Sequence, residues 1–367
     1  MYLLVTFCVV IIIQLYFYSF LFRKYTSFKP DKQLTIPKAV SIIIAAKNEA
    51  ANLNRLLPRL SEQEFQSFEL ILIDDASSDN TLEIMHSFKE MHDSTKLYIE
   101  ILSISSKDSN GKKAALTKGI AAAKNEYILL TDADCQPKSN LWISQMSRCF
   151  SKKASLVLGY GAYEKRSKSY LNKLIRFETM LTALQYFSYA IAGNAYMGVG
   201  RNLAYKKSIF ESAGGFEKHH HIKSGDDDLF VSEVANSENI AICDHQEAFT
   251  ISKSHVSFAG WIRQKRRHVT TASHYSKKIK IMLGLFYLSQ FFFYALALLA
   301  LISNTYLAYV IPLIILRFLV WLVTINQTAK RLDEKDLMAF GPLYEISIIF
   351  IQLYIFLKNI ISPPKYW

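Results

Sequence analysis

Long apolar segments with at most one charged residue each lie toward both ends of the chain, and a segment of mixed character lies between them. Residues 2–22 carry no charge and have about the ~20 residues that a helix needs to cross the hydrocarbon core of a membrane. Three more apolar runs follow toward the other end, at residues 281–302, 306–325 and 343–357. The pattern predicts an uncleaved membrane anchor at residues 1–24 and a C-terminal transmembrane region at residues 281–361.

Two charged residues interrupt the C-terminal runs. Glu345 lies near the start of the shortest run, which fits either a full span or a re-entrant or interfacial segment. We therefore expect two to three transmembrane helices in this region. Arg317 lies inside the third run, where a charge is costly in hydrocarbon. It is expected either to serve function or to pair with a polar group on a neighbouring helix.

Basic residues flank the apolar runs on one side of the predicted membrane. They follow the first run, precede the second and separate the third from the fourth, at Arg23, Lys24, Lys29, Lys277, Lys278, Lys280, Lys330, Arg331 and Lys335. Because the cytoplasmic flanks of membrane spans are enriched in Lys and Arg, this distribution predicts that residues 35–279 are cytoplasmic. The chain is accordingly predicted to be a multi-pass protein of the cell inner (plasma) membrane.

The middle segment alternates strand and helix patterns. Apolar, β-branched runs predict strands, and apolar residues at helical spacing predict helices. The expected strands are residues 40–45, 68–73, 97–102 and 127–130, and the expected helices are residues 49–60, 81–91 and 112–123. Strands that are apolar throughout and alternate with helices indicate an α/β fold with a parallel sheet. Open sheets of this kind bind ligands beyond the carboxyl ends of their strands.

Composition narrows the class of protein. Hydrophobic residues make up 51% of the 367 residues and charged residues only 20%, which excludes a disordered chain and argues against a purely soluble one. The formal net charge is +12, and basic residues cluster beside the apolar runs. We therefore expect membrane lipids as partners and no nucleic acid. The four cysteines contain no CxxC pair, so a reducing compartment is expected, without disulfides or a zinc site.

Three clusters of carboxylates stand out in the middle segment, and two of them directly follow expected strands. They are Asp74-Asp75-x-x-x-Asp79, Asp132-x-Asp134 and Asp226-Asp227-Asp228. Each cluster alone is compatible with a turn or a helix cap. Three such clusters are harder to explain in this way, because packed carboxylates repel one another unless a cation or a cationic substrate compensates.

The spacing of Asp132 and Asp134 suits a metal ion. In extended backbone the two side chains point to the same side. They could hold one Mg²⁺ or Mn²⁺ together with diphosphate oxygens, because these cations prefer oxygen ligands. Lys112, which follows Gly111, offers a positive charge for the phosphates. Neither GxxxxGK[ST] nor GxGxxG occurs, so a nucleotide would be bound by another arrangement.

The order of these motifs resembles that of the family 2 glycosyltransferases, over about residues 39–268. Eight motifs carry the resemblance: Ser41-Ile-Ile-Ile-Ala-Ala-Lys47-Asn48-Glu49, Asp74-Asp75-x-Ser77-x-Asp79-x-Thr81, Gly111-Lys112, Asp132-x-Asp134, Gly200-x-Asn202-x-Ala204, Gly214-Gly215-Phe216, Gly225-Asp226-Asp227 and Gln264-x-x-Arg267. The pattern is similar to the membrane-embedded branch, which includes the cellulose, chitin, hyaluronan and poly-N-acetylglucosamine synthases. Processive synthases have a Trp after the last motif, whereas this chain has His268, so single transfer stays open.

The resemblance implies a GT-A fold, with residues 35–279 as its cytoplasmic domain, and an inverting transfer from a nucleotide-diphosphate sugar. It implies a catalytic base at Asp227, metal binding at Asp134 and Asp132, nucleotide-sugar binding at Ala45, Glu49, Asp75, Lys112 and Asp132, and closure over donor and acceptor at Asp226, Gln264 and Arg267. Asp226 and Asp228 are rival candidates for the base. The implied chemistry needs one carboxylate to take the acceptor proton and one metal ion to neutralise the leaving diphosphate.

Three functions follow from these observations. The first is a metal-dependent membrane enzyme of polysaccharide biosynthesis in the cell envelope, which moves sugar from a UDP-sugar to a lipid or polysaccharide acceptor. The second glycosylates a polyisoprenyl phosphate and makes no polymer. The third is a nucleotide-binding membrane transporter, which the low polar content of the apolar runs disfavours.

The apolar stretch at residues 177–199 lies between the second and third carboxylate clusters. A single membrane crossing there would put the two clusters in different compartments. We therefore expect a helix that lies on the membrane surface or lines the acceptor groove, or alternatively a buried core helix.

Overall fold

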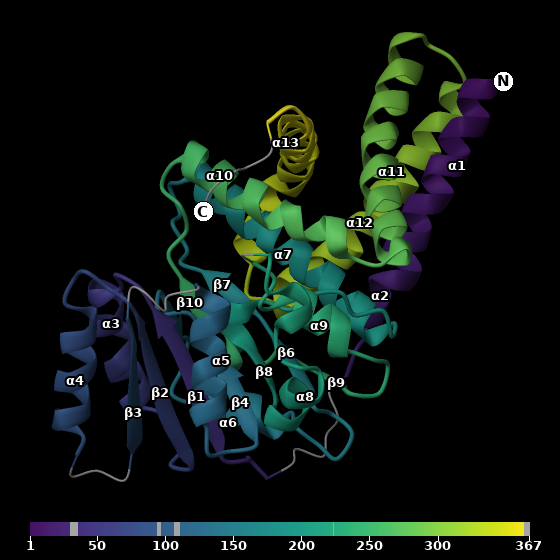
Figure 1. Ribbon diagram of the computed structural model, residues 1–367. Coiled ribbons are helices and arrows are strands. Elements are labelled where there is room, and N and C mark those ends of the chain that lie inside the picture. The colour runs from purple at the N-terminus through teal and green to yellow at the C-terminus, as the bar shows by residue number, and fades with distance from the viewer. Residues whose placement is uncertain (30–35, 94–96, 106–110, 223, 363–367) are drawn as a thin grey trace. The chain divides into compact units, whose positions relative to one another are not determined.

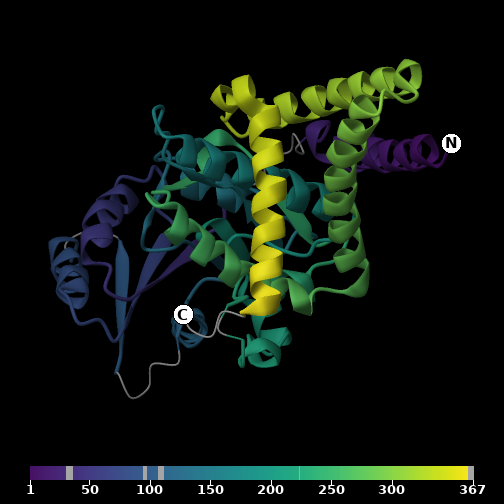
Figure 2. The same cartoon turned by 90° about the horizontal axis from the view of Figure 1, so that it is seen from above.

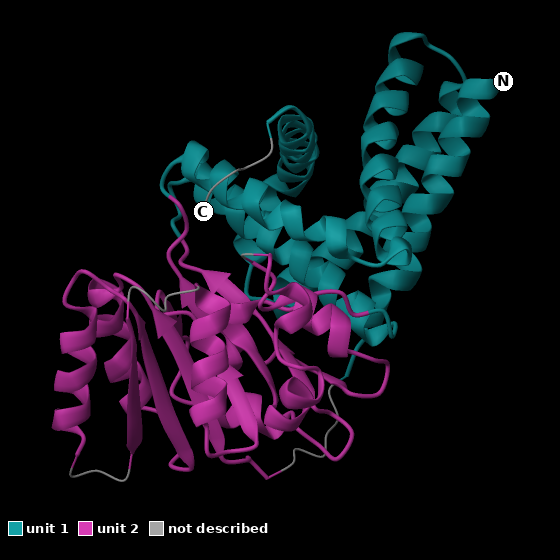
Figure 3. Ribbon diagram, viewed as in Figure 1, with its two compact units in different colours: residues 1–29, 166–194, 256–366 teal, residues 30–165, 195–255, 367 magenta. Residues whose placement is uncertain are grey.

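Two compact units make up the computed structural model of the chain (Figure 3). The described residues are 1–29, 36–93, 97–105, 111–222 and 224–362. The helical unit comprises residues 1–29, 166–194 and 256–366, and the α/β unit comprises residues 30–165, 195–255 and 367. The segment expected as one domain, residues 35–279, therefore contributes to both units, and its expected first residue lies outside the described ranges.

A sheet of seven described strands forms the centre of the α/β unit (Figure 1). Its order is β3-β2-β1-β4-β8-β6-β9. The strands are β1 (Val40–Ala46), β2 (Phe68–Asp75), β3 (Tyr98–Ile104), β4 (Tyr127–Leu130), β6 (Leu156–Gly159), β8 (Leu203–Lys206) and β9 (Ile240–Cys243). Strands β3, β2, β1 and β4 are parallel, which confirms the α/β prediction. Strand β8 is antiparallel to both β4 and β6.

Helices cover both faces of this sheet. On one face, α3 (Ala50–Ser61), α4 (Thr81–Met91) and α6 (Trp142–Arg148) share a buried core with Val40, Ile42 and Ile44 of β1. On the other face, α5 (Lys112–Ala122) lies so close that a Cβ on Gly119 would meet Ile73 and Ile43 at 2.6 and 2.8 Å. Because strand side chains alternate between faces, wholly apolar strands fill both cores.

A small second sheet, three strands in the part of the chain that is described, lies within the same unit. Its order is β5-β10-β7, with β5 (Cys135–Pro137), β10 (Thr250–Ser252) and β7 (Gly161–Tyr163). Strand β5 begins immediately after Asp134, so this sheet continues from the acidic cluster. The remaining helical elements of the unit are η2 (Gly200–Asn202), α8 (Lys207–Ser212), η3 (Glu217–His219), α9 (Asp228–Val234) and η4 (Gln246–Ala248).

The helical unit contains four helices, among the described residues, that are long and apolar enough to cross a membrane (Figure 2). They span Tyr2–Thr26, Lys277–Ile302, Leu307–Arg331 and Lys335–Ile361. The first combines α1 (Tyr2–Tyr16), a π-helical turn η1 (Phe17–Leu21) and α2 (Arg23–Thr26); the others are α11 (Lys277–Ile302), α12 (Leu307–Arg331), and η6 (Lys335–Phe340) with α13 (Gly341–Ile361). The fourth apolar run therefore has the length of a full span.

A buried polar cluster joins these helices. The guanidinium group of Arg317 on α12 donates to both Glu345 oxygens on α13, at 2.9 and 2.6 Å, and to Gln14 Oε1 on α1, at 3.0 and 3.3 Å. Gln290 Nε2 on α11 donates to Glu345 Oε1 at 2.9 Å. All four side chains are at most 3% exposed. Arg317 thus has the structural pairing that was one of its two predicted roles.

The apolar stretch at residues 177–199 is mostly one helix of the helical unit. Helix α7 (Tyr170–Ile191) has buried residues on every side, which fits a core helix. The ring of its Phe187 stacks on Tyr25 at 5.0 Å, and its Arg176 pairs with Glu334 and Asp336. α7 is not among the four membrane-length apolar helices found in the described ranges. This packing favours the core-helix interpretation.

Candidate active site

The loops that follow β1 and β2 are fastened together by side chains of the first acidic motif. Ser77 Oγ accepts from the backbone N–H of Asn48 at 3.0 Å, and Thr81 Oγ1 accepts from that of Glu49 at 2.8 Å. Asn48 Oδ1 accepts in turn from the N–H of Ser78 at 2.8 Å. The polar residues that follow Asp75 in this motif therefore stabilise a turn, as such residues often do. They hold the two loops in place at the carboxyl edge of the sheet.

Three predicted nucleotide-binding residues lie at this edge. Ala45 is near the end of β1, Glu49 is the residue just before α3, and Asp75 ends β2. Asp75 is buried and lies 4.0 Å from the ammonium of Lys47. The next residue, Ala76, has φ of +55°, a conformation that non-glycine residues adopt at a cost and that clusters at functional sites.

Asp132 and Asp134 form the compact acidic group that their spacing predicted. Their carboxylates and the Cys135 sulfur each offer a ligand atom, and these atoms lie within 4.8 Å of one another. Burial and the charge of Asp132 raise the pKa of Asp134. Burial also raises the pKa of Glu49 against a lowering hydrogen bond from Asn52, and the charges of Asp134 and Asp132 add to the rise. A divalent cation between these carboxylates would relieve their repulsion, so the residues fit a Mg²⁺ or Mn²⁺ ion.

Lys112 connects the second and third acidic clusters. Its ammonium lies 2.8 Å from Asp132 Oδ1 and 2.8 Å from Asp226 Oδ2. Burial lowers the pKa of Lys112, but these carboxylates outweigh burial and hold the pKa well above its usual value. Lys112 begins α5, after Gly111 in a left-handed conformation with φ of +81°. The fixed positive charge therefore stands between the predicted metal ligands and the predicted base.

The three consecutive aspartates occupy different environments. Burial raises the pKa of Asp226, but the Lys112 ammonium outweighs this and lowers it. Asp228 is buried as the first residue of α9. Asp227 is half-buried, and its carboxylate accepts from the N–H groups of Gly200 at 2.8 Å and Asp228 at 2.7 Å. Burial and the two neighbouring carboxylates raise the pKa of Asp227 to about 7.

Gly225 makes the turn that presents these aspartates. Its φ is +89°, and a Cβ would meet Leu229 of α9 at 2.5 Å. Any other residue would be strained and would push against the helix. The glycine therefore allows α9 to begin directly beneath the carboxylates.

Two positively charged residues at this site, Arg201 and Lys113, were not among the predicted site residues. Arg201 donates to Gly161 O at 2.6 Å and Ser252 Oγ at 2.9 Å, and it lies over the Tyr163 ring at 4.4 Å. Lys113 donates to the backbone carbonyls of His219, which ends η3, at 2.7 Å and of Ile222, which follows η3, at 3.0 Å. Both are neighbours of motif residues, and that adjacency was the available signal. Asn202, which the motif did include, is wholly buried and bonds Trp142 and two carbonyls.

The last two predicted site residues belong to the helical unit. Gln264 and Arg267 lie on α10 (Phe258–Val269), which begins at the cap Ser257. On the same helix, Lys265 pairs with Glu178 of α7 at 2.6 Å, and Arg266 donates to Asn359 of α13 at 2.8 Å. The eight other predicted site residues all belong to the α/β unit. Closure over the donor and acceptor by Gln264 and Arg267 stays a prediction.

Comparison with known proteins agrees with the fold and the motifs. The model of the family described as glycosyl transferase family 2 matches residues 41–214. Residues 41–214 thus match a family 2 glycosyltransferase domain. A mannosyltransferase structure from Pyrobaculum calidifontis, in complex with GDP-Man and Mn²⁺, has the same fold, with a TM-score of 0.57 at 15% identity over 94% of this chain and 98% of that one.

Two curated relatives illustrate the level of similarity. The poly-beta-1,6-N-acetyl-D-glucosamine synthase of Staphylococcus epidermidis is 27% identical over 228 residues, which cover 59% of this chain and 51% of the relative. The "probable glycosyltransferase YdaM" of Bacillus subtilis (strain 168) is 26% identical over 211 residues, which cover 53% of this chain and 48% of the relative. The chain thus spans about half the length of the curated relatives it matches.

Proposed function

We propose that this enzyme transfers a sugar from a UDP-sugar to a lipid or polysaccharide acceptor at the cytoplasmic face of the plasma membrane, with inversion at the anomeric carbon. The observation that carries the proposal is the position of Lys112 between Asp132 and Asp226. This contact joins the second and third acidic clusters, and the first cluster begins at the end of β2, at the carboxyl edge of the same sheet. The named relative that makes poly-beta-1,6-N-acetyl-D-glucosamine favours UDP-N-acetylglucosamine as the donor.

The donor diphosphate would lie beside Lys112. In the free enzyme, Asp132 and Asp226 hold the Lys112 ammonium in place. A phosphate oxygen of the bound donor would share this ammonium with the two carboxylates. Asp75, Glu49 and Ala45 would contact the nucleoside at the ends of β1 and β2. Asp132 and Asp134 would hold a divalent cation, which when bound neutralises charge on the leaving diphosphate.

Asp227 would act as the base. Its carboxylate is held by the Gly200 and Asp228 N–H groups, so its orientation is set before the acceptor arrives. A pKa of about 7 lets it be ionised in part of the population at neutral pH and still attract a proton. Asp226 is a poorer base, because Lys112 stabilises its charged form. The acceptor hydroxyl would attack the anomeric carbon from the side opposite the diphosphate, and this single displacement inverts that carbon.

Purified full-length enzyme in detergent tests the proposal. With Mn²⁺ or Mg²⁺ and a panel of UDP- and GDP-sugars, we expect UDP release from UDP-N-acetylglucosamine. Asp134→Ala should lower this release by at least ~10²-fold, because Asp132 would be left as the one carboxylate of the pair to hold the cation. The exposed Glu238 lies outside the site, and Glu238→Gln is the matched control.

The outcomes separate the candidate functions. No nucleotide release with any donor would contradict a transferase and favour nucleotide binding for transport. Near-normal turnover of a folded Asp134→Ala variant at low Mn²⁺ would contradict the metal assignment. Product mass distinguishes a growing glycan from single transfer onto a polyisoprenyl phosphate.

A further inference from the structure

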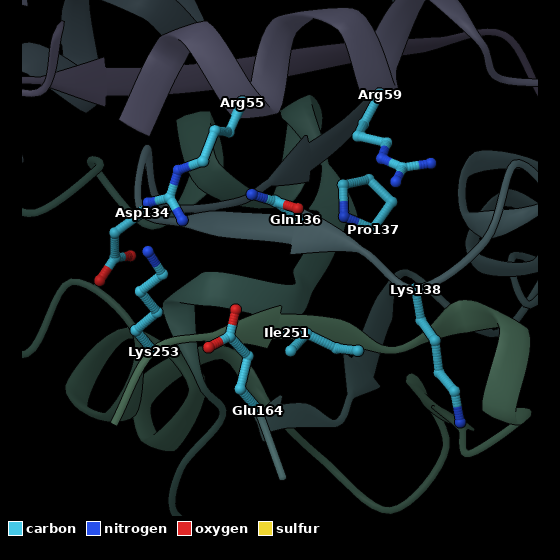
Figure 4. A pocket seen from close by; sticks show the side chains of 9 residues that line it. All are labelled: Arg55, Arg59, Asp134, Gln136, Pro137, Lys138, Glu164, Ile251 and Lys253. Atoms are coloured by element: carbon cyan, nitrogen blue, oxygen red, sulfur yellow. The ribbon is translucent and has the colours of Figure 1, made fainter. Parts of the chain in front are cut away.

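A cavity of about 250 Å³ lies beside Asp134 in the α/β unit, between α3 and the small sheet (Figure 4). Four basic side chains and two carboxylates line it: Arg55, Arg59, Lys138, Lys253, Asp134 and Glu164. The cations thus outnumber the carboxylates by two. The donor and base roles proposed above use none of these four cations, so the excess of positive charge needs another explanation.

The basic side chains come from two sides of the cavity. Arg55 and Arg59 are four residues apart on α3, so they lie on the same face of the helix. Lys253 follows β10 of the small sheet. Figure 4 shows Arg55 and Lys253 directed toward the Asp134 end of the cavity. Guanidinium groups bind phosphate with two parallel hydrogen bonds, and a lysine ammonium adds a point charge.

We propose that this cavity binds a phosphate group carried by the acceptor, and this inference rests on the function proposed above. A cation held by Asp134 would cancel that carboxylate and leave the cavity more positive. The donor diphosphate has its own partner in Lys112, which pairs with Asp132 and Asp226. A phosphate held at the Asp134 end of the cavity, toward which Arg55 and Lys253 point, would therefore anchor the acceptor apart from the donor diphosphate.

A ³¹P NMR titration tests the cavity directly. It measures the binding of inorganic phosphate to the full-length protein in detergent and Mg²⁺. Lys253→Gln and Arg59→Gln should each weaken binding by about fivefold, the size expected for a charge pair open to solvent. Arg55 is a poorer choice, because it bonds Asn52, which in turn bonds the predicted nucleotide residue Glu49.

Glu62→Gln is a matched control. Arg59 pairs with Glu62 at 3.4 Å on the surface of α3, so this variant breaks the same pair as Arg59→Gln but removes no cation from the cavity. It should bind phosphate at least as tightly as the wild type. Saturating UDP should leave phosphate binding in place, because the two ligands occupy different sites. Displacement of phosphate by UDP, or equal binding by all variants, would overturn the proposal.

Turnover links the cavity to the acceptor. With a membrane extract as the source of acceptor, Lys253→Gln should lower the ratio of sugar transfer to donor hydrolysis, since hydrolysis needs no acceptor. An equal fall in both rates would overturn the acceptor assignment. Phosphate binding without any sugar transfer would instead contradict the proposed function and leave the phosphate site standing, so the two failures are distinguishable.

Discussion

Three adjacent aspartates show how position alone differentiates identical side chains. Lys112 pairs with Asp226 at 2.8 Å and lowers its pKa, and Asp228 is buried at the start of α9. Asp227 is left half-buried, between two backbone donors and two carboxylates. These differences favour Asp227 as the base, because it combines access to solvent with a raised proton affinity.

The base assignment predicts both a rate and a pH profile. Asp227→Asn should slow transfer by about 10²–10⁴-fold, the usual cost of removing a general base, while nucleotide binding survives. Since Asp227 must be ionised and its pKa is raised to about 7, wild-type kcat/KM should be low in acid and rise as pH increases through 7. Initial rates from pH 5 to 9 and nucleotide titrations measure both effects.

The rival aspartates provide the comparison for this prediction. Asp226→Asn removes a partner of Lys112, so it should weaken nucleotide binding as well as transfer. Asp228→Asn should mainly lower the thermal unfolding midpoint, because this side chain is buried at the start of α9. Normal transfer by Asp227→Asn together with a selective loss in either neighbour would move the base along the motif.

The sequence predicted the acidic residues of the site better than its basic ones. Carboxylates drew attention because clustered like charges are costly without a partner. The role of Arg201 could not be seen, because its contacts at Gly161 and Ser252 join segments far apart in the chain. Likewise, the residue types after Asp75 fit both ligand binding and a turn. Their hydrogen bonds in the structure show that most of them hold the loops after β1 and β2 together.

Among the elements, the four apolar helices enclose the charged side chain of Arg317, and a buried polar cluster pairs it. Its guanidinium is satisfied by Glu345 from α13 and Gln14 from α1. Buried ion pairs add little net stability but are costly to break, because the remaining charge has no partner. The cluster thus couples α1, α12 and α13 to one arrangement.

Removing one member of this pair should destabilise the helical unit. We expect Glu345→Leu and Arg317→Met each to lower the free energy of unfolding by about 3–5 kcal/mol, the range for breaking a buried pair. The double variant leaves no unpaired charge and should be more stable than either single variant. Thermal unfolding of the detergent-solubilised protein measures the order of the four stabilities.

The exposed Gln352 on the same helix gives the control, and Gln352→Leu should unfold like the wild type. Single variants as stable as the wild type would mean that the pair does not hold the helices together. A double variant that is stable yet inactive would instead support the functional role that a charge in an apolar run also predicted.

At the scale of the whole molecule, periodicity predicted local elements well and their assembly only in part. Strands β1 to β4 lie within two residues of their expected bounds, because each is a compact apolar run. The antiparallel insertion of β8 (Leu203–Lys206) between β4 and β6 was not predicted. Its partners are more than 40 residues away in the chain, and Leu203–Lys206 is not an apolar run like the four residues of β4, so periodicity gives no signal for it.

The distribution of basic residues also predicts how the molecule lies across a membrane. Arg23 and Lys24 lie in α2, at the end of the first apolar helix, and Lys330 and Arg331 end α12, whereas the turn at residues 303–305 has no basic residue. Positive flanks are retained on the cytoplasmic side. We therefore expect the α/β unit in the cytoplasm and the turn between α11 and α12 outside.

Single-cysteine labelling of intact cells tests this orientation. Ser87 on α4 and Ser303 after α11 are both exposed, so a cysteine at either position is accessible from its own side of the membrane. In a Cys8→Ser background, an impermeant maleimide should label Ser303→Cys in intact cells, and Ser87→Cys only after lysis. Labelling of Ser87→Cys in intact cells would reverse the topology and place the nucleotide-sugar site outside the compartment in which such donors are made, which would contradict the proposed function as well.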